Sequence, residues 1–374
     1  FFSIMGRYKK IPLQRIVDNY LGRIFNLALL LTKKNIEKGD FLKNPKKIVI
    51  FRLSSIGDSI LLLPAIKNFK EKTRAEIIVV CSKENLPVFT GQPFVDKIII
   101  LDNKSINPLK IFKVLGKIKK ENADICIDTT HSSNLSSFFS YFGGKFHIGF
   151  SNPGTNIRNR IYDKTKQLNP RKHMALNYLD LFSLAGVRYD GKGVRLIKPV
   201  YSDKEENKIK EELGNKKKLV GIHAVSELPY KKWPADNFTK LIKFVSSKGY
   251  IPVLIGSPSE KGMIEILLKN IDKKTLNGVI DLSGNTSIKE LFALMPRLSL
   301  FAAIDGGPMH IAASMNVPTL GLFSKAPEDP ALGLFGAKDR FRYYPLNKKS
   351  NILYKEDIRD LEFSEVEKAL EKML

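Results

Sequence analysis

An acidic residue follows an apolar run near the start of the chain, in the stretch KKIVIFRLSSIGDSI (residues 46–60). The run ends at Arg52, and Asp58 precedes LLLPAIKNFK, whose pattern predicts a helix. A carboxylate at the start of a helix often only stabilises the helix end. It could also accept a proton from a substrate hydroxyl, as a general base does. The residues leave both interpretations of Asp58 open.

The stretch AAIDGGPMHIAASMNVP (residues 302–318) could bind phosphate. A strand is expected to end at Asp305, and a helix to begin within Gly306, Gly307 and Pro308. The N–H groups and the dipole of such a first turn attract anions. His310 lies in the same turn. The alternative is an ordinary strand-to-helix turn in which His310 is a cap.

Two further stretches also follow predicted strands. HAVSELPYKKWPADNF (residues 223–238) contains Ser226 and Lys231, and a lysine there could neutralise a diphosphate. LIGSPSEKG (residues 254–262) contains Glu260, which could accept hydrogen bonds from ribose hydroxyls. The alternatives are a solvated lysine on a surface loop and an acid that favours a helix dipole.

In the first half of the chain, DTTHSSN and RNRIYDK place three basic side chains at strand ends or in loops. They are His131, Arg158 and Arg160. These residues could face an anionic acceptor, but their spacing does not require it. His131 could equally stabilise its loop.

Apolar β-branched runs alternate with helical patterns from residue 46 onward, which predicts an α/β fold with parallel sheets. Helices are expected near 58–71, 83–90, 107–121, 133–142, 236–248, 259–270, 287–296 and 307–316, and one in HMALNYLDLFSLAG ends at Gly186. The polar stretch 187–217 marks a domain boundary near 195–205. We expect an extension (1–45), two open α/β domains (46–200 and 201–345) that face each other across a cleft, and a C-terminal helix (346–374).

The formal net charge is +24, which predicts an anionic partner: nucleic acid, an anionic membrane or a phosphorylated substrate. Residues 1–50 contribute eleven Lys and Arg against three Asp and Glu. Within them, LGRIFNLALLLTKK is too short to span a bilayer and lacks a signal-peptide cleavage site. This basic helix could lie on an anionic membrane surface or pack on the domain. Cys81 and Cys126 lack ligand spacing, so we expect a reducing, cytoplasmic compartment.

Four blocks together resemble glycosyltransferase family 9, the ADP-heptose:lipopolysaccharide heptosyltransferases. They are IVIFRLSSIGDSILLLPAI, GIHAVSELPYKKWPADNF, VLIGSPSEK and IDGGPMHIAASMNVPTLGLF, in the family's order. The resemblance covers most of residues 46–325 and leaves 1–45 outside. It implies a GT-B fold, with two Rossmann-like domains, the acceptor on the first and the nucleotide-sugar on the second. It also implies an inverting transfer without an obligatory metal or other cofactor.

The resemblance also implies roles for individual residues. Asp58 would be the general base. Apart from the resemblance, we expect Ser55, His131, Arg158 and Arg160 on the acceptor side. The expected donor-binding residues are Ser226, Lys231, Glu260, Asp305, Gly306, Gly307 and His310, with no metal ligand. The chain departs from the family at Gly306, where many members have Ser or Thr, and at Ser226-Glu227, where hydroxyl residues are common. These departures bear on which sugar-nucleotide is the donor.

The leading hypothesis is transfer of a heptose or related sugar from an ADP-sugar to a lipopolysaccharide core acceptor carrying Kdo or heptose. A cytoplasmic enzyme is expected, with peripheral contact to the inner membrane through residues 1–45 as an open possibility. The alternatives are a glycosyltransferase with another NDP-sugar and a GT-B sugar-nucleotide epimerase. An RNA-binding protein is a further class, but the chain lacks the aromatic-basic interleaving typical of nucleic-acid motifs, so nucleic acid is not an expected partner.

Overall fold

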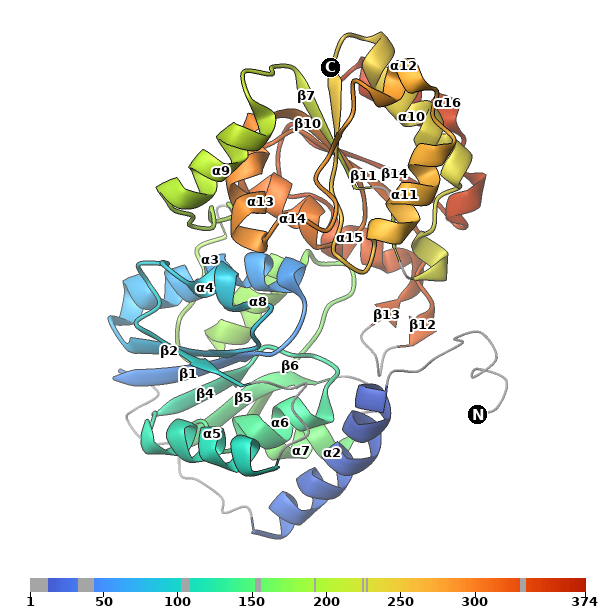
Figure 1. Cartoon of the computed structure of the whole chain (residues 1–374). Helices are drawn as coiled ribbons and strands as arrows, with labels where there is room; N and C mark the ends of the chain where they lie inside the picture. The colour runs from blue at the N-terminus through green and yellow to red at the C-terminus, as the bar shows by residue number, and fades with distance from the viewer. Residues whose placement is uncertain are drawn as a thin grey trace.

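The computed structural model shows a chain built in two halves, each with its own β-sheet (Figure 1). It describes residues 13–32, 44–101, 108–151, 156–191, 193–223, 225–226, 228–329 and 334–374. Within these residues the strands form two six-stranded parallel sheets and one short antiparallel pair, β12 (Glu328–Asp329) with β13 (Leu334–Phe335). The predicted α/β fold class is therefore confirmed.

The N-terminal half, up to residue 191, holds the first sheet in the order β3-β2-β1-β4-β5-β6. Its strands are β1 (Lys47–Arg52), β2 (Glu76–Cys81), β3 (Lys97–Ile100), β4 (Ile125–Asp128), β5 (Phe146–Ser151) and β6 (Lys164–Gln167). The face toward the other half carries α3 (Ile56–Thr73), α4 (Leu86–Phe89) and α8 (Met174–Ser183) (Figure 1). The opposite face carries α5 (Pro108–Lys120), α6 (Asn134–Ser140) and α7 (Asn156–Ile161).

The C-terminal half, from residue 193, holds the second sheet in the order β14-β11-β10-β7-β8-β9. Its strands are β7 (Leu219–His223), β8 (Ile251–Leu254), β9 (Ile280–Asp281), β10 (Leu298–Ile304), β11 (Thr319–Ser324) and β14 (Asn351–Lys355). One face carries α9 (Asp203–Leu213), α13 (Ile288–Leu294) and α14 (Gly307–Ser314), and the other α10 (Ala235–Ser247), α11 (Lys261–Lys269), α12 (Lys273–Leu276) and α16 (Phe363–Glu371). Helix α15 (Asp339–Tyr343) lies near the junction of the halves, and 3-10 turns cover Pro229–Lys231, Met295–Arg297, Gly336–Lys338 and Ile358–Asp360.

Both sheets follow the same strand order when the strands of each half are numbered along the chain. That order is 3-2-1-4-5-6, which is the order of Rossmann folds. The order reverses between β1 and β4 in the first sheet and between β7 and β10 in the second. Ligands of such sheets bind outside the carboxyl ends of the strands at this reversal. The residues that follow these four strands are therefore the ones placed to meet a ligand.

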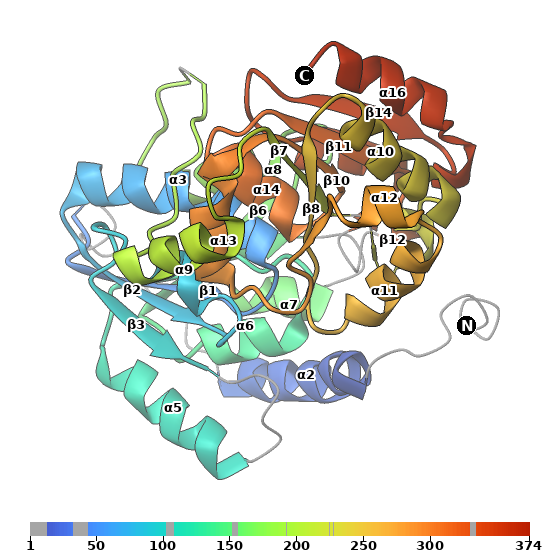
Figure 2. The same ribbon diagram turned by 45° about the horizontal axis from the view of Figure 1, so that its top comes forward.

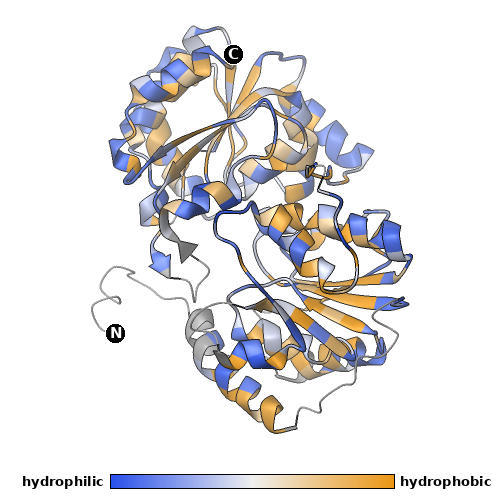
Figure 3. Cartoon of the chain, turned by 180° about the vertical axis from the view of Figure 1, so that it is seen from behind, coloured by the Kyte–Doolittle hydropathy of each residue, from blue (hydrophilic) through white to orange (hydrophobic). Residues whose placement is uncertain are grey.

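Strand β1 shows why the strands read as continuous apolar runs. Ile48 and Ile50 face one hydrophobic core and Val49 and Phe51 face another, and all four are fully buried. A parallel sheet covered by helices on both faces needs apolar side chains at every position. The orange strands between striped helices in Figure 3 show the same arrangement in both halves.

Most helices lie close to their predicted bounds, but the sequence pattern missed β6, α7, α9 and β14. Strand β6 lies at a sheet edge and alternates between half-buried and exposed residues, so it lacks an apolar run. Helix α9 buries only Ile209 and Leu213 among charged residues. The C-terminal segment contributes β14 as well as a helix, and α8 ends at Ser183 rather than at Gly186. The residue limits predicted for the domains stay predictions.

Helix α2 (Leu13–Thr32) precedes the first sheet and packs against α6 and α7 (Figure 2). The carboxylate of Asp18 accepts hydrogen bonds from Ser133 Oγ at 2.6 Å and from the backbone N–H groups of Asn134 at 3.0 Å and Leu135 at 2.9 Å. Asp18 thus caps α6 from another helix. The remainder of the predicted extension, residues 1–12 and 33–43, lies outside the described residues. Among the described helices, none has both the length and the apolarity needed to cross a bilayer.

Candidate active site

The carboxylate of Asp58 lies in the first turn of α3, just after the end of β1. Its Oδ2 accepts a hydrogen bond from Arg52 Nη2 at 3.0 Å, and its Oδ1 accepts one from the Tyr178 hydroxyl at 2.9 Å. The buried guanidinium of Arg52 also donates to the Tyr178 hydroxyl at 3.1 Å and to the Thr129 carbonyl oxygen at 3.1 Å. These three side chains form a closed polar cluster at the reversal point of the first sheet.

This cluster keeps Asp58 ionised. Burial alone would raise the pKa of Asp58, but the charge of Arg52 and the hydrogen bond from Tyr178 outweigh burial and lower it to about 2. Such a carboxylate takes a proton only from a strong acid. A sugar hydroxyl becomes one when its oxygen bonds to an anomeric carbon. The geometry therefore suits a base that takes up the proton as the new bond forms.

The side chain that caps α3 is that of Ser55, so the carboxylate of Asp58 is not the cap of this helix. Ser55 Oγ accepts a hydrogen bond from the backbone N–H of Asp58 at 3.3 Å. Ser55 also has a φ of 65°, which is uncommon for a residue other than glycine and recurs at functional sites. Its side chain is exposed next to Asp58. The acceptor-binding role of Ser55 and the catalytic role of Asp58 stay predictions.

Lys231 and Asp305 form an ion pair at the reversal point of the second sheet. Lys231 Nζ donates to Asp305 Oδ2 at 2.6 Å and to the Asp305 carbonyl oxygen at 3.1 Å. Burial lowers the pKa of Lys231, but the charge of Asp305 outweighs burial and raises the pKa above its ordinary value, so the amine stays charged. An ammonium has three donors, and this pair uses two of them. Both residues line a cavity together with Tyr230, Phe323, Ser324, Ala326, Asp339 and Tyr343.

Helix α14 begins directly beyond Asp305, with Gly306 as its N-cap and Gly307 as its first residue. Gly306 has no side chain to cap the helix, so the backbone N–H groups of the first turn remain able to bind an anion. The backbone at Gly306 is extended, and a Cβ built there would lie 3.7 Å from His223 Cε1. The backbone therefore does not demand glycine, and the site has room for a small side chain.

His310 of α14 touches α3 at Gly57, so the two halves meet at the beginnings of these helices. A Cβ built on Gly57 would lie only 2.7 Å from His310 Cδ2. His310 is buried, and its Nδ1 makes no hydrogen bond with the described residues. Burial lowers the pKa of His310, so its imidazole is neutral at pH 7. This contact brings Asp58 of one half next to the phosphate-binding turn predicted in the other.

Glu260 lies at the N-terminus of α11, beyond the end of β8. Its Oε2 accepts from the Ser257 backbone N–H at 2.7 Å and from Ser257 Oγ at 2.9 Å, and lies 3.6 Å from His223 Nε2. Burial raises the pKa of Glu260, but His223 and Ser257 outweigh it and lower the pKa. Ser226 Oγ accepts from the Leu228 backbone N–H at 3.1 Å. Its neighbour at position 227 lies outside the described residues.

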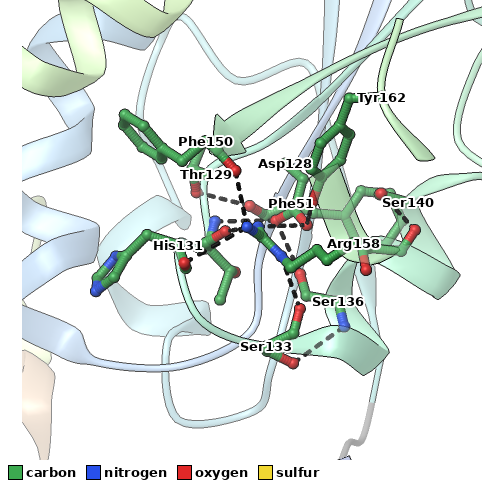
Figure 4. Close-up of polar contacts among 12 residues, drawn as sticks. Phe51, Asp128, Thr129, His131, Ser133, Ser136, Ser140, Phe150, Arg158 and Tyr162 are labelled. Atoms are coloured by element: carbon green, nitrogen blue, oxygen red, sulfur yellow. Dashed lines mark hydrogen bonds and ion pairs between the residues drawn. The ribbon is translucent and has the colours of Figure 1, made fainter. Parts of the chain in front are cut away.

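Arg158 lies on α7 with its guanidinium fully buried in the N-terminal half (Figure 4). It donates to the carbonyl oxygens of Phe150 at 2.8 Å and Ser133 at 3.0 Å, and also to that of Thr130. Its Nη2 lies 3.5 Å from Asp128 Oδ2. Arg158 therefore ties the loop between β4 and α6 to the sheet. A direct role in acceptor binding stays a prediction.

The other two residues predicted for the acceptor side differ in their exposure. His131 is buried in the loop after β4, where it interacts electrostatically with Asp58. Burial first, and then the charge of Arg342, lower the pKa of His131 to about 3, so its imidazole is neutral at pH 7. Arg160 is exposed on α7. The structure thus brings His131 to the Asp58 cluster, and an acceptor-binding role for Arg160 stays a prediction.

Sequence reasoning missed Arg52, Tyr178 and His223. Arg52 offered a signal, because a charged residue at the end of a buried strand needs a partner. His223 offered a similar signal at the end of β7. Tyr178 offered none, since it stands among apolar residues of α8 and meets Asp58 across 120 positions of sequence.

Residues 111–373 match glycosyltransferase family 9 (heptosyltransferase). The chain belongs to this family. This family 9 glycosyltransferase is 24% identical over 289 residues to lipopolysaccharide heptosyltransferase 3 of Escherichia coli K12, which covers 71% of the chain and 79% of the relative. It is also 24% identical over 298 residues to lipopolysaccharide heptosyltransferase 1 of Campylobacter coli, which covers 75% and 84%.

Solved structures show the same fold. A family 9 glycosyl transferase from Veillonella parvula DSM 2008 is similar with a TM-score of 0.75 at 21% identity, over 91% of this chain and 99% of that one. The ADP-heptose lps heptosyltransferase II of E. coli is similar with a TM-score of 0.70 at 18% identity, over 87% and 98%. The predicted GT-B fold with two Rossmann-like domains is confirmed.

In the part of the chain that the structure describes, no three His, Cys, Asp or Glu side chains are grouped so that they could hold a metal ion. Lys231 and the beginning of α14 place positive charge at the candidate donor site.

Proposed function

We propose that this family 9 glycosyltransferase moves a heptose or a related sugar from an ADP-sugar to a lipopolysaccharide core acceptor that carries Kdo or heptose. Its relatives are named as lipopolysaccharide heptosyltransferases, and a similar solved structure is the E. coli heptosyltransferase WaaC with ADP. One observation carries the proposal. The Asp58 carboxylate and the Lys231–Asp305 pair lie at the reversal points of two sheets, one in each half, and the two halves meet where Gly57 contacts His310.

The reaction divides between the two halves. The donor diphosphate would bind at the first turn of α14 and at Lys231, with Glu260 on the ribose. As the bond from the sugar to the diphosphate breaks, negative charge grows on the leaving oxygen, and the N–H groups and the ammonium stabilise it. These fixed donors supply the positive charge that a metal supplies elsewhere, so we propose a transfer without metal or other cofactor.

The acceptor hydroxyl would attack from the side of the N-terminal half. Because the leaving group is held by the C-terminal half, attack comes from the opposite face of the sugar and inverts the anomeric centre. The attacking oxygen becomes strongly acidic as its bond to carbon forms, and Asp58 then takes the proton. Arg52 and Tyr178 hold the carboxylate and keep it ionised.

We also propose that the enzyme works in the cytoplasm at the inner face of the inner membrane, where its glycolipid acceptor is displayed. The formal net charge of +24 supports this location, because the acceptor and the bilayer surface are both anionic.

A thermal-shift screen with ADP, UDP, GDP and CMP tests the donor. ADP at saturating concentration should raise the melting temperature by several degrees, because a ligand that binds only the folded state stabilises it. A preference for UDP would overturn the heptose assignment. The second measurement is ADP release from ADP-heptose with and without a Kdo-containing acceptor. Release must depend on the acceptor, and turnover of a UDP-sugar without acceptor would indicate the epimerase instead.

A further inference from the structure

Helix α2 turns two polar side chains, those of Asp18 and Asn26, toward the protein. Asn26 is fully buried, and its Nδ2 donates to the Asn134 carbonyl oxygen at 3.0 Å and to Ser137 Oγ at 2.9 Å. A Cβ built on Gly22 would lie 2.7 Å from Asn134 Cβ, so the two helices are in close contact there. Asp18 caps α6 from the same side. The contact stripe at positions 18, 22 and 26 follows the four-residue spacing of one helix face.

The outward side of α2 is apolar. Five large side chains stand there with exposures between 44% for Leu21 and 85% for Leu31: Tyr20, Leu21, Ile24, Leu27 and Leu31. Phe25, which is 39% exposed, lies at the edge of this side and packs against Phe138 of α6. A surface helix of a globular protein normally has the reverse arrangement, with its apolar face inward and its polar face in water. A contiguous apolar face held outward by specific polar contacts indicates a surface that binds something apolar.

We propose that this outward face of α2 docks the protein onto an anionic lipid bilayer, with the helix axis in the plane of the interface. Amphipathic helices bind membranes in this way through apolar residues that enter the headgroup region and basic residues near it. Residues 1–50 supply eleven Lys and Arg against three Asp and Glu. One of those three acids, Asp18, is turned toward α6.

Helix α5 adds to the same surface. It lies on the same face of the first sheet as α6, and Figures 1 and 2 show it on the same side of the molecule as α2. Phe112 is 66% exposed, and exposed lysines follow it at positions 113, 117, 119 and 120. Apolar side chains next to a row of lysines are complementary to acyl chains below a layer of anionic headgroups.

A second copy of the chain fits this surface less well than a bilayer does. A two-fold pairing through α2 would place the same patch of each subunit against its counterpart. Exposed basic residues that the structure describes, Arg23 on α2 and the lysines of α5, would then approach their counterparts, and like charges repel. The charge of the surface therefore favours an anionic bilayer as its occupant.

Vesicle co-sedimentation tests the proposal on the full chain. The triple variant Ile24→Gln, Leu27→Gln and Leu31→Gln changes only exposed side chains, so its melting temperature should match that of the parent. The parent should sediment with vesicles of phosphatidylethanolamine and phosphatidylglycerol, and less at high salt. The triple variant should bind them at least about tenfold more weakly, because each leucine or isoleucine contributes through burial in the interface.

The matched control is Ile266→Gln on α11, since Ile266 is 61% exposed and Ile24 is 59% exposed. Ile24→Gln alone should weaken vesicle binding, whereas Ile266→Gln should leave it unchanged. Equal binding by the parent and the triple variant would overturn the proposal, as would failure of the parent to bind. Light scattering that shows a dimer which the triple variant separates would assign the face to a second copy.

This inference does not depend on the sugar or the acceptor. The vesicles contain neither donor nor glycolipid acceptor, so binding is measured without transfer. If no sugar is transferred but vesicle binding behaves as described, only the proposed function fails. If ADP is released with a detergent-dispersed acceptor but the triple variant binds vesicles like the parent, only the docking surface fails.

Discussion

Replacing Asp58 by asparagine removes the negative charge of the buried cluster while keeping its shape, and leaves the charge of Arg52. The amide oxygen can still accept one hydrogen bond from Arg52 or Tyr178, so the fold should persist. General bases contribute about 10²–10⁴-fold to rate, and kcat should fall by about that factor. Affinity for ADP should not change, because the predicted donor residues lie in the other half. Rapid transfer by Asp58→Asn would refute the assignment of Asp58 as the base.

The same variant should be less stable. Removing one partner of a buried ion pair costs about 3–5 kcal/mol, because the other charge stays buried. Here the guanidinium of Arg52 keeps the carbonyl oxygens of Ser54 and Thr129 and the Tyr178 hydroxyl as acceptors. We therefore expect a loss of free energy of unfolding near the lower end of that range.

The pH dependence gives a sharper number. The pKa of Asp58 is about 2 in the folded protein, against an ordinary value of 3.8. Folding thus favours the ionised form, so its contribution is complete well above pH 4 and is lost as the pH falls toward 2. The difference corresponds to about 2 kcal/mol in total, of which about 1 kcal/mol is lost between pH 7 and pH 3.

Urea denaturation at pH 7 and at pH 3 measures this contribution. Between these two pH values the parent should lose about 1 kcal/mol more stability than Asp58→Asn does. Asp203→Asn, which changes an exposed acid on α9, is the control and should lose as much as the parent. Equal losses by the parent and Asp58→Asn would show that Arg52 and Tyr178 do not lower the pKa of this carboxylate.

Three further changes probe the other contacts of the site. Lys231→Met should weaken ADP binding by about 10- to 100-fold, since a hydrogen bond to a charged group contributes about 1.5–3 kcal/mol. Calorimetry with ADP measures the affinity, and an unchanged affinity would mean that the lysine does not reach the diphosphate. Gly57→Ala should lower kcat/KM by about tenfold or more and the melting temperature by a few degrees, because its Cβ would lie 2.7 Å from His310 Cδ2 and overpack the contact between the halves at a cost of about 1–3 kcal/mol. Unchanged kinetics would mean that the halves do not need this contact. Tyr178→Phe removes one hydrogen bond to Asp58 and should raise the pKa of that carboxylate toward its ordinary value, so the variant should lose less stability than the parent between pH 7 and pH 3, as urea titrations at several pH values can establish.

The sequence was sufficient to predict the fold where strands are buried on both faces. Strand β1 was recognisable because its positions between Lys47 and Arg52 are all apolar, and the helix after it because a longer, largely apolar run follows. Strand β6 and helix α9 were not, because an edge strand and a charged helix bury too few side chains to leave a pattern. Their positions depend on the sheet and helices that they pack against.

The candidate site divides in the same way. Asp58, Lys231 and Asp305 were predictable because each follows a strand end, where parallel sheets bind ligands. The contact of Tyr178 with Asp58 spans 120 positions, and no local pattern reports it. The orientation of α2 could not be predicted either, since the sequence shows an amphipathic helix but not which of its faces packs against the domain.

The cap that Asp18 forms on α6 has a mechanical consequence. Because it satisfies the first N–H groups of a helix that packs directly on the sheet, α2 moves only together with the whole N-terminal half. In a molecule docked through α2, the N-terminal half is fixed at the bilayer, so any motion between the halves is a motion of the C-terminal half. The nucleotide product would then move away from the bilayer with the C-terminal half, while the glycosylated acceptor stays with the N-terminal half.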